Sequence, residues 1–425
     1  LVRNTMFELN VMENGLSVVG SHMPHARSVT ICALIRTGSR YETASNSGVS
    51  HLLEHMLFKG TEQFPDPRMI SEGIEKVGGS MNASTDREFT TYWCKVPSEY
   101  VSEALEILSD MLLAPLFVPG ELDKERFVVL EEIHMSLDDP ASKAELLLER
   151  VLWGQHPLGM HIAGTEESLN QIDITELTKY WRSQYSPGNT VLSIAGKIDR
   201  DSVMGDIERL FGSWAPMDAL PFSSFVSYQT SPQILVESRK TQQTQVCMAF
   251  HGVSVTDPTR HAVSLLDTIL GDGMSSRLFV ELRENKALTY DIHSYSNELA
   301  DCGSFHINAG VDSKRLREAL RGVTDELIGI RSNLTASELE KARTLLSGRM
   351  ALRLEDSRNV ALWLGGQQAT FGSIKTPDEA MEEIMAVTLE EVMLAAQDMF
   401  TPTNLNVAIL GPHKSVGRVA SYLAL

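Results

Sequence analysis

The sequence predicts an α+β fold made of two homologous domains, and three observations lead to this class. Segments of the first half recur in the second half in the same order. Each half contains both strand-like and helix-like stretches. These stretches are clustered and do not alternate strictly as strand, helix, strand, which is typical of α+β layers. At 425 residues the chain is also too long for one ordinary core.

An internal repeat sets the expected domain organisation. The matching pairs of segments are 29–34 with 245–250, 49–57 with 264–270, and 121–126 with 338–343, the last continuing without a gap to 137–139 and 354–356. The separation between partners is nearly constant, which is hard to explain by chance. We therefore expect domains at 1–215 and 231–425. The linker between them, 216–230, contains two prolines and paired serines near its start.

Local patterns predict the elements of the first half in order. Strands rich in β-branched and aromatic residues are expected at 16–20, 28–36, 89–96 and 190–196. Helices with an apolar period near 3.6 residues are expected at 46–58, 67–77, 98–114, 121–137 and 174–184.

The composition excludes several classes of function. The net charge of −19, from 37 basic and 56 acidic residues, argues against nucleic-acid binding, which needs basic patches. Because no run of 18 apolar residues occurs, we expect no membrane span. The acidic balance favours basic substrates weakly, and a solvated acidic surface is at least as good an explanation.

The cysteines and the N-terminal stretch bear on the compartment. Four cysteines are present and none forms C-x-x-C, so we expect reduced thiols rather than a disulfide framework. The first residues lack the apolar core of a secretory signal. We expect a cytoplasmic location, with a mitochondrial matrix as the alternative.

The strongest functional motif is the five residues from His51 to His55, which have the order H-x-x-E-H. Residues four apart lie on one face of a helix, so His51 and His55 can bind one metal ion. Glu54 lies close enough to reach a water beside that ion. This order is typical of a zinc hydrolase, and a chance match is the alternative.

A third ligand is expected on the helix at 121–139. Catalytic zinc usually takes three protein ligands and leaves one position open. Glu125 and Glu132 are seven residues apart and share a helix face. We interpret Glu132 as the ligand and Glu125 as a partner that orients a ligand. Glu131 is the rival ligand, and a solvated acidic face is the alternative explanation.

The repeat supplies an internal control for this interpretation. In the second half Ser264, Asp267 and Thr268 stand where the first half has His51, Glu54 and His55. Two further positions lose their carboxylates, because Ala342 and Arg349 replace Glu125 and Glu132. The histidines and the carboxylates disappear together, which supports a shared metal site in the first domain. We expect no metal chemistry at the equivalent place in the second domain.

Nearly the whole chain resembles the inverzincin or pitrilysin-type metallopeptidases, and within them the mitochondrial processing peptidase β-like branch with its bacterial relatives. The segments that carry the resemblance are 51–61, 78–85, 125–133 and 275–290. It implies Zn²⁺ bound by His51, His55 and Glu132, with Glu125 in support. It also implies a clamshell chamber, of which the two domains form one half.

The resemblance implies two substrate-binding groups. A strand carrying Asn82 and Ala83 would pair with an extended peptide through backbone hydrogen bonds. Arg283 and Tyr290 would hold the substrate carbonyl and stabilise its developing charge. Zinc would lower the pKa of water to about 7, with Glu54 as general base.

The expected function is therefore zinc-dependent endoproteolysis of unfolded peptides or precursor segments. The alternative is a non-catalytic scaffold or partner subunit, as some relatives of this family are. All the motif residues are present here, which favours an enzyme. We expect a homodimer, with a heterodimer containing a metal-free homologue as the alternative.

Overall fold

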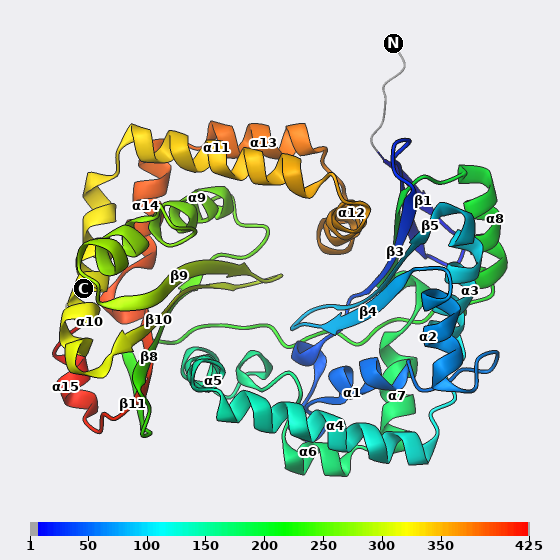
Figure 1. Ribbon diagram of the computed structural model, residues 1–425, viewed down its shortest axis with the longest axis horizontal. Helices are drawn as coiled ribbons and strands as arrows, with labels where there is room; N and C mark the ends of the chain where they lie inside the picture. Colours follow the sequence, from blue (N-terminus) through cyan, green and yellow to red (C-terminus); the bar gives the residue numbers. More distant parts are fainter. Residues whose placement is uncertain (1–6, 424–425) are drawn as a thin grey trace. The chain divides into compact units, whose positions relative to one another are not determined.

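The computed structural model describes residues 7–423 and has an α+β fold, as predicted (Figure 1). Two mixed sheets, of six and five strands, are each covered by helices. The chain divides into two compact units, described separately below. The first unit contains the residues up to Ile133, Met160–Ser223 and Ala351–Thr376. The second contains His134–Gly159, Ser224–Met350 and the residues from Pro377 onward.

The sheet of the first unit has the order β1-β2-β6-β3-β5-β4. Its strands are β1 (Glu8–Val11), β2 (Ser17–His22), β3 (Ser28–Ile35), β4 (Ser80–Thr85), β5 (Thr90–Pro97) and β6 (Thr190–Gly196). β2 and β6 are parallel, and the other pairs are antiparallel. The four strands predicted from local patterns are confirmed. At the edges lie β4, which contains Asn82 and Ala83 as the resemblance implied, and β1, which was not predicted.

Helices cover both faces of this sheet. The helices of the first sequence half are α1 (Val49–Met56), α2 (Pro67–Glu75), α3 (Val101–Leu113), α4 (Pro119–Asp138), α5 (Pro140–Trp153), α6 (Glu166–Gln171), α7 (Ile174–Gln184) and α8 (Arg200–Phe211). Because both faces of the sheet are covered, the residues of β3 pack into two different cores. Ile31 belongs to the core under α1 and α3, whereas Cys32 and Leu34 face a second core that includes α12 (Ser357–Phe371). Because alternate residues of a strand point to opposite faces, a nearly unbroken apolar run is needed.

The second unit repeats this topology without a counterpart of β1. Its sheet has the order β7-β11-β8-β10-β9, and β7 and β11 form its parallel pair. The strands are β7 (Gln233–Ser238), β8 (Gln243–Gly252), β9 (Thr289–Glu298), β10 (Gly303–Asp312) and β11 (Leu405–Gly411). The remaining helices are α9 (Arg260–Leu270), α10 (Leu316–Asn333), α11 (Ala336–Arg353), α13 (Pro377–Ala386), α14 (Leu389–Met399) and α15 (Val416–Ala420). The repeated segments fall on equivalent elements: β3 with β8, α1 with α9, and α4 with α11.

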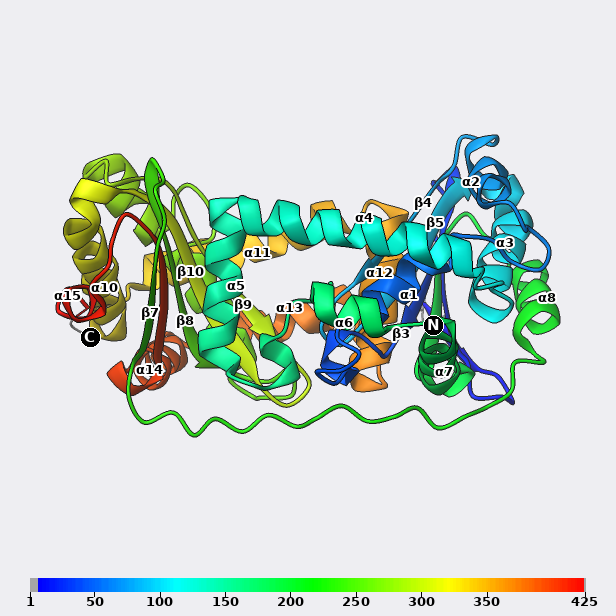
Figure 2. The ribbon, with the colours of Figure 1, turned by 90° about the horizontal axis from the view of Figure 1, so that it is seen from below.

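One helix from each sequence half packs on the sheet of the other half. α5 lies against β8 and β11 of the second sheet, and α12 lies against β3 and β6 of the first (Figures 1 and 2). The approach of α12 is close, since a Cβ at Gly365 would lie 2.5 Å from Leu34 Cδ1. The predicted boundaries at 1–215 and 231–425 describe the sequence repeat. The compact units differ from these boundaries because α5 belongs to the second unit and α12 to the first.

Residues 214–232, where a linker at 216–230 is predicted, contain no helix or strand. The four cysteines are free, and three of them are buried. No helix among residues 7–423 has both the length and the apolar character needed to cross a membrane.

Candidate metal centre and active site

The helix α1 carries the H-x-x-E-H residues and is fixed in the first unit by its apolar face. Leu52, Leu53 and Met56 are buried in the core. The helix begins after Gly48, which has φ 93°, and a Cβ there would lie 2.5 Å from the carbonyl oxygen of Ala163. Only glycine suits this backbone conformation and this close contact. The half-buried His51 and His55 lie on the opposite side from the apolar core.

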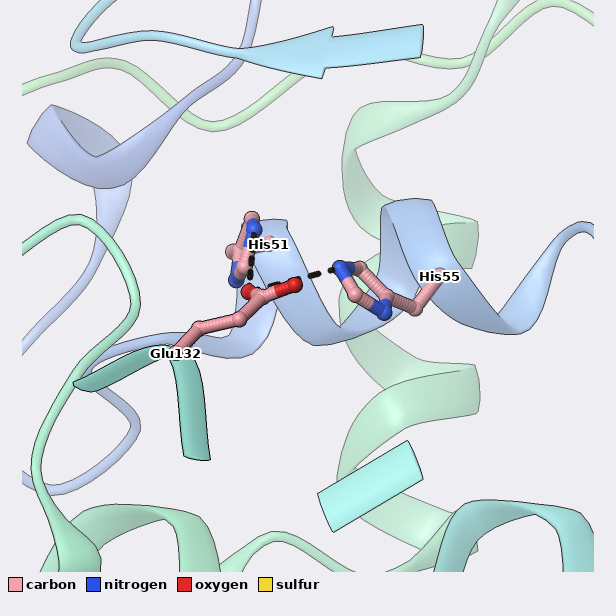
Figure 3. Close-up of side chains that lie close together, drawn as sticks. All are labelled: His51, His55 and Glu132. Atoms are coloured by element: carbon pink, nitrogen blue, oxygen red, sulfur yellow. Dashed lines mark ion pairs between the residues drawn. The ribbon is translucent and has the colours of Figure 1, made fainter. Parts of the chain in front are cut away.

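Glu132 of α4 points toward both imidazoles, as Figure 3 shows. Its Oε2 lies 3.6 Å from His51 Nε2 and 3.9 Å from His55 Nε2. Among the described residues, these three form the group whose ligand atoms lie within 4.8 Å of one another. Two ligands each about 2.1 Å from a tetrahedral zinc ion would be about 3.4 Å apart. The spacing and the nitrogen and oxygen donors therefore fit Zn²⁺. The neighbouring Glu131 is exposed and is not part of the group.

Glu125 fixes the orientation of His55. Its Oε2 lies 3.0 Å from His55 Nδ1, and its Oε1 lies 2.7 Å from the Lys59 ammonium. Burial alone would raise the pKa of Glu125, but the bonds from His55 and Lys59 outweigh it and lower the pKa. An ionised carboxylate only accepts hydrogen bonds, so Nδ1 carries the proton and Nε2 keeps its lone pair for a metal.

The two histidines have different protonation behaviour. Burial would lower the pKa of His55, yet its bond to Glu125 and the charges of Glu132 and Glu54 raise it. Burial lowers the pKa of His51 to about 4, with the nearby His55 and His161 adding to the effect. A neutral His51 is the form that binds a metal ion.

Glu54 is almost completely buried, and one of its oxygens is held. Thr85, the last residue of β4, donates from Oγ1 to Glu54 Oε2 at 2.5 Å. Burial raises the pKa of Glu54 above its ordinary value, against the bond from Thr85. A carboxylate with a raised pKa and one oxygen not engaged by Thr85 suits a general base.

The equivalent position in the second unit has a different arrangement. Arg349, at the place of Glu132, forms an ion pair with Asp272. Asp267, at the place of Glu54, accepts a hydrogen bond from Ser294 Oγ at 2.5 Å. Both halves thus keep a hydrogen bond from a hydroxyl of the edge strand to a carboxylate of the helix. The second half, however, has the cationic Arg349 at the position where the first half has the ligand candidate Glu132.

Comparisons with known proteins decide the family. Residues 17–166 match the family model described as insulinase (peptidase family M16), and residues 171–346 match the peptidase M16 inactive domain. The chain is 35% identical over 408 residues to the uncharacterized zinc protease YmxG of Bacillus subtilis, covering 96% of this chain and 98% of that protein. The uncharacterized zinc protease SCO5738 of Streptomyces coelicolor is 32% identical over 410 residues, which cover 95% of this chain and 89% of that protein. This chain belongs to the insulinase family of peptidases. The family expected from the sequence is therefore confirmed.

Solved structures agree with the fold of this insulinase-family chain. A protease from Helicobacter pylori has a TM-score of 0.89 at 21% identity, covering 96% of this chain and 99% of that one. A peptidase M16 inactive domain from Pseudomonas fluorescens also has a TM-score of 0.89 at 21% identity, covering 96% and 98%.

The predicted peptide-binding strand is β4. It lies at the edge of its sheet and pairs with β5 on one side, with Asn82 opposite Trp93 and Ala83 opposite Tyr92. Asn82 Oδ1 accepts a hydrogen bond from the Ala83 amide at 2.8 Å. An edge strand can pair with an added strand, as β-augmentation requires.

Arg283 and Tyr290 lie together in the second unit. The Arg283 guanidinium carbon is 5.0 Å from the centre of the Tyr290 ring and 4.6 Å from that of Phe279. The segment Phe279–Asn285 is a π-helix, and Tyr290 lies at the start of β9 with 75% of its surface exposed. The pair presents a guanidinium and a phenol side by side.

Several residues of the site were not predicted from the sequence. Lys59 could have been found, because it follows His55 by four residues and lies near the same helix end. Thr85 has no spacing relation to Glu54. His161 belongs to no motif of the sequence, yet its charge contributes to the low pKa of His51. Its loop reaches α1 through the close contact between Ala163 and Gly48.

Proposed function

We propose that this insulinase-family peptidase is a zinc-dependent endopeptidase that cleaves unfolded peptides or precursor segments. The observation that carries the proposal is the donor group of His51, His55 and Glu132, with ligand atoms within 4.8 Å of one another. Its nitrogen and oxygen donors and its spacing suit zinc. The similarity to proteins named as zinc proteases supports the same metal.

The residues of the first unit have distinct roles in this proposal. His51, His55 and Glu132 would hold a zinc ion, which would supply a Lewis acid able to polarise the scissile carbonyl and to lower the pKa of water to about 7. Glu125 holds His55 in the tautomer that presents Nε2. Glu54 Oε1 accepts a proton from the attacking water and later delivers it to the leaving amine, while Thr85 keeps Oε2 in place.

Substrate binding is proposed at two places. The edge of β4 around Asn82 and Ala83 would pair with an extended peptide, whose backbone provides the same hydrogen bonds whatever its sequence. Arg283 and Tyr290 would donate to the substrate carbonyl as it gains charge. The net charge of −19 favours basic peptides as substrates only weakly, because a solvated acidic surface explains it equally well.

Digestion of a peptide library, read by mass spectrometry with zinc content measured in parallel, tests this function. We expect the wild-type protein to hold zinc and to cleave internal bonds. The Glu54→Gln variant should keep its zinc and lose hydrolysis, because its amide cannot accept the proton. Glu121→Gln, an exchange on α4 away from the donor group, is the control and should behave as wild type. A zinc-loaded wild-type protein that cleaves no peptide would instead be the non-catalytic scaffold, and the proposal would be wrong.

The expected homodimer, the chamber and the cytoplasmic location stay predictions. Sedimentation of the purified chain at several concentrations distinguishes a homodimer from a chain that needs a different partner.

A further inference from the structure

Glu42 is a buried carboxyl group just upstream of the helix that carries the H-x-x-E-H residues. It lies just after the short 3₁₀-helix Ser39–Tyr41 and is 3% exposed. Its Oε2 accepts a hydrogen bond from the Gly48 amide at 2.7 Å, and its Oε1 accepts one from the Ser50 amide at 2.8 Å. Both amides belong to the beginning of α1.

The first turn of α1 needs this external partner. The first amides of any helix have no acceptor within the helix, and a side chain at the N-cap usually supplies one. The N-cap of α1 is Gly48, which has no side chain to do so. Glu42 therefore provides the cap from six residues upstream. Since α1 has only eight residues, its N-terminal anchor affects the position of the whole helix.

The segment that carries Glu42 is itself held by the turn after β4. The Ser39 amide donates to the Asp86 carbonyl at 3.1 Å, and the Arg40 amide donates to the Arg87 carbonyl at 2.9 Å. The buried Arg40 side chain is 2.5 Å from Glu88 Oε1 and also donates to the Ser223 carbonyl at 3.1 Å. The segment is thus fixed against the β4–β5 turn.

These contacts close a ring that passes through α1, the end of β4 and the segment 39–42. The turn begins directly after Thr85, and Thr85 donates to Glu54 on α1. From α1 the ring returns through Glu42 to Ser39 and Arg40, and from there to the same turn. A shift or rotation of α1 would break the ring either at Glu54 or at Glu42. The contact at Glu54 and the contacts at Glu42 together fix the position of α1 along its axis and its rotation about that axis.

A second chain of hydrogen bonds strengthens the Glu42 end. Ser50 Oγ lies 2.8 Å from the Tyr180 hydroxyl, which lies 2.9 Å from Thr37 Oγ1. Burial raises the pKa of Glu42 to about 8, although the bonds from Gly48 and Ser50 act against this rise. The charged form of this carboxyl group therefore costs folding stability. An apolar residue would avoid that cost but would leave the Gly48 and Ser50 amides without this acceptor.

We propose that Glu42 is a positioning residue for the metal centre, which sets where His51 and His55 stand relative to Glu132. This inference rests on the proposed zinc site. It assigns no contact between Glu42 and substrate or metal. Its action passes through the backbone of Gly48 and Ser50, one residue before His51.

The test compares metal binding by Glu42→Gln with that of the wild-type protein. The amide keeps the shape of the side chain but turns one acceptor into a donor facing a backbone N–H. We expect a folded protein whose zinc affinity, measured by competition with a chelator, falls about 10-fold. In the cobalt-substituted protein we expect the visible absorption bands to shift or lose intensity, because the ligand geometry changes. In peptide hydrolysis, kcat should fall by a larger factor than the factor by which KM changes.

Asp199→Ala is the matched control for a general loss of stability. Asp199 caps α8 through the Ser202 amide at 3.0 Å, and this helix carries no member of the metal group. We expect wild-type zinc affinity and the wild-type cobalt spectrum in this variant. An equal change in both variants would overturn the proposal, as would unchanged zinc affinity and cobalt spectrum in Glu42→Gln.

Tyr180→Phe provides a second test that does not depend on how well Glu42→Gln folds. It removes the hydroxyl between Ser50 and Thr37 and keeps the ring, so a smaller weakening of zinc binding in the same direction is expected. If Glu42→Gln does not fold and Tyr180→Phe binds zinc as wild type does, the proposal is wrong. A wild-type protein that binds neither zinc nor cobalt would refute the proposed function itself.

Discussion

Removal of the Glu125 carboxylate is the sharpest test of how His55 is held. The Glu125 residue is 5% exposed, and its carboxylate lies 3.0 Å from His55 Nδ1 and 2.7 Å from the Lys59 ammonium. Because the site is buried, water cannot readily take the place of this carboxylate as the acceptor for His55. A hydrogen bond to a charged group contributes about 1.5–3 kcal/mol. If Glu125→Ala loses this amount only in the metal-bound state, zinc binding weakens about 10- to 150-fold.

Glu125→Gln should have a smaller effect. Its amide oxygen can still accept from Nδ1–H, and a neutral acceptor gives a bond about half as strong as a charged one. The expected loss is about 0.8–1.5 kcal/mol, or about 4- to 13-fold in zinc affinity. We therefore expect zinc affinity to decrease from the wild type to Glu125→Gln and again to Glu125→Ala.

The assay is chelator competition at fixed pH and ionic strength, with circular dichroism to verify folding. Lys124→Met is the matched control on α4, because Lys124 is exposed and pairs with Glu121 away from the donor group. The reasoning would be refuted if Glu125→Ala bound zinc within about twofold of wild type, since outer partners of a ligand typically contribute 10- to 100-fold.

Three further outcomes are expected. Glu132→Gln should lose most of its zinc by metal analysis, whereas Glu131→Gln should keep it; the opposite result would make Glu131 the ligand. Leu364→Ala should lower the hydrogen-exchange protection of β3 by about 2–5 kcal/mol, because Leu364 is fully buried on the first sheet, and the exposed Leu352→Ala should not. Burial, with Asp272 adding to it, raises the pKa of Asp267 from 3.8 to about 6 against the bond from Ser294. The folded state therefore loses stability as the pH rises from about 4 to 6. Asp267→Asn should be more stable than wild type above pH 6 by about 2–3 kcal/mol, and equally stable below pH 4, in urea titrations. Equal stability at pH 8 would contradict this.

Local sequence was sufficient for most elements of the first half. The predicted helix at 174–184 and strand at 190–196 have the same bounds in the structure. These patterns are reliable because periods of 3.6 and 2 residues follow directly from helix and strand geometry. The edge strand β1 is only four residues long and half exposed, so it has too weak a pattern to be recognised.

The exchange of α5 and α12 between the two sequence halves could not be predicted. The apolar run in β3 indicates that both faces of its sheet are covered, but a pattern of apolar residues does not specify which helix covers them. That choice depends on shape, as at Gly365, where the absence of a Cβ lets α12 approach Leu34.

The sequence by itself determined the two-fold repeat, the fold class and the metal-ligand candidates His51, His55 and Glu132. These depend on spacing along one helix or on comparison of one half with the other, and both can be read without a structure. Only the tertiary structure revealed Thr85 and Glu42 as the partners that hold these residues and their helix in place. Single polar side chains carry no periodic signal, and only the folding of distant segments brings them to within a hydrogen bond of the groups they orient.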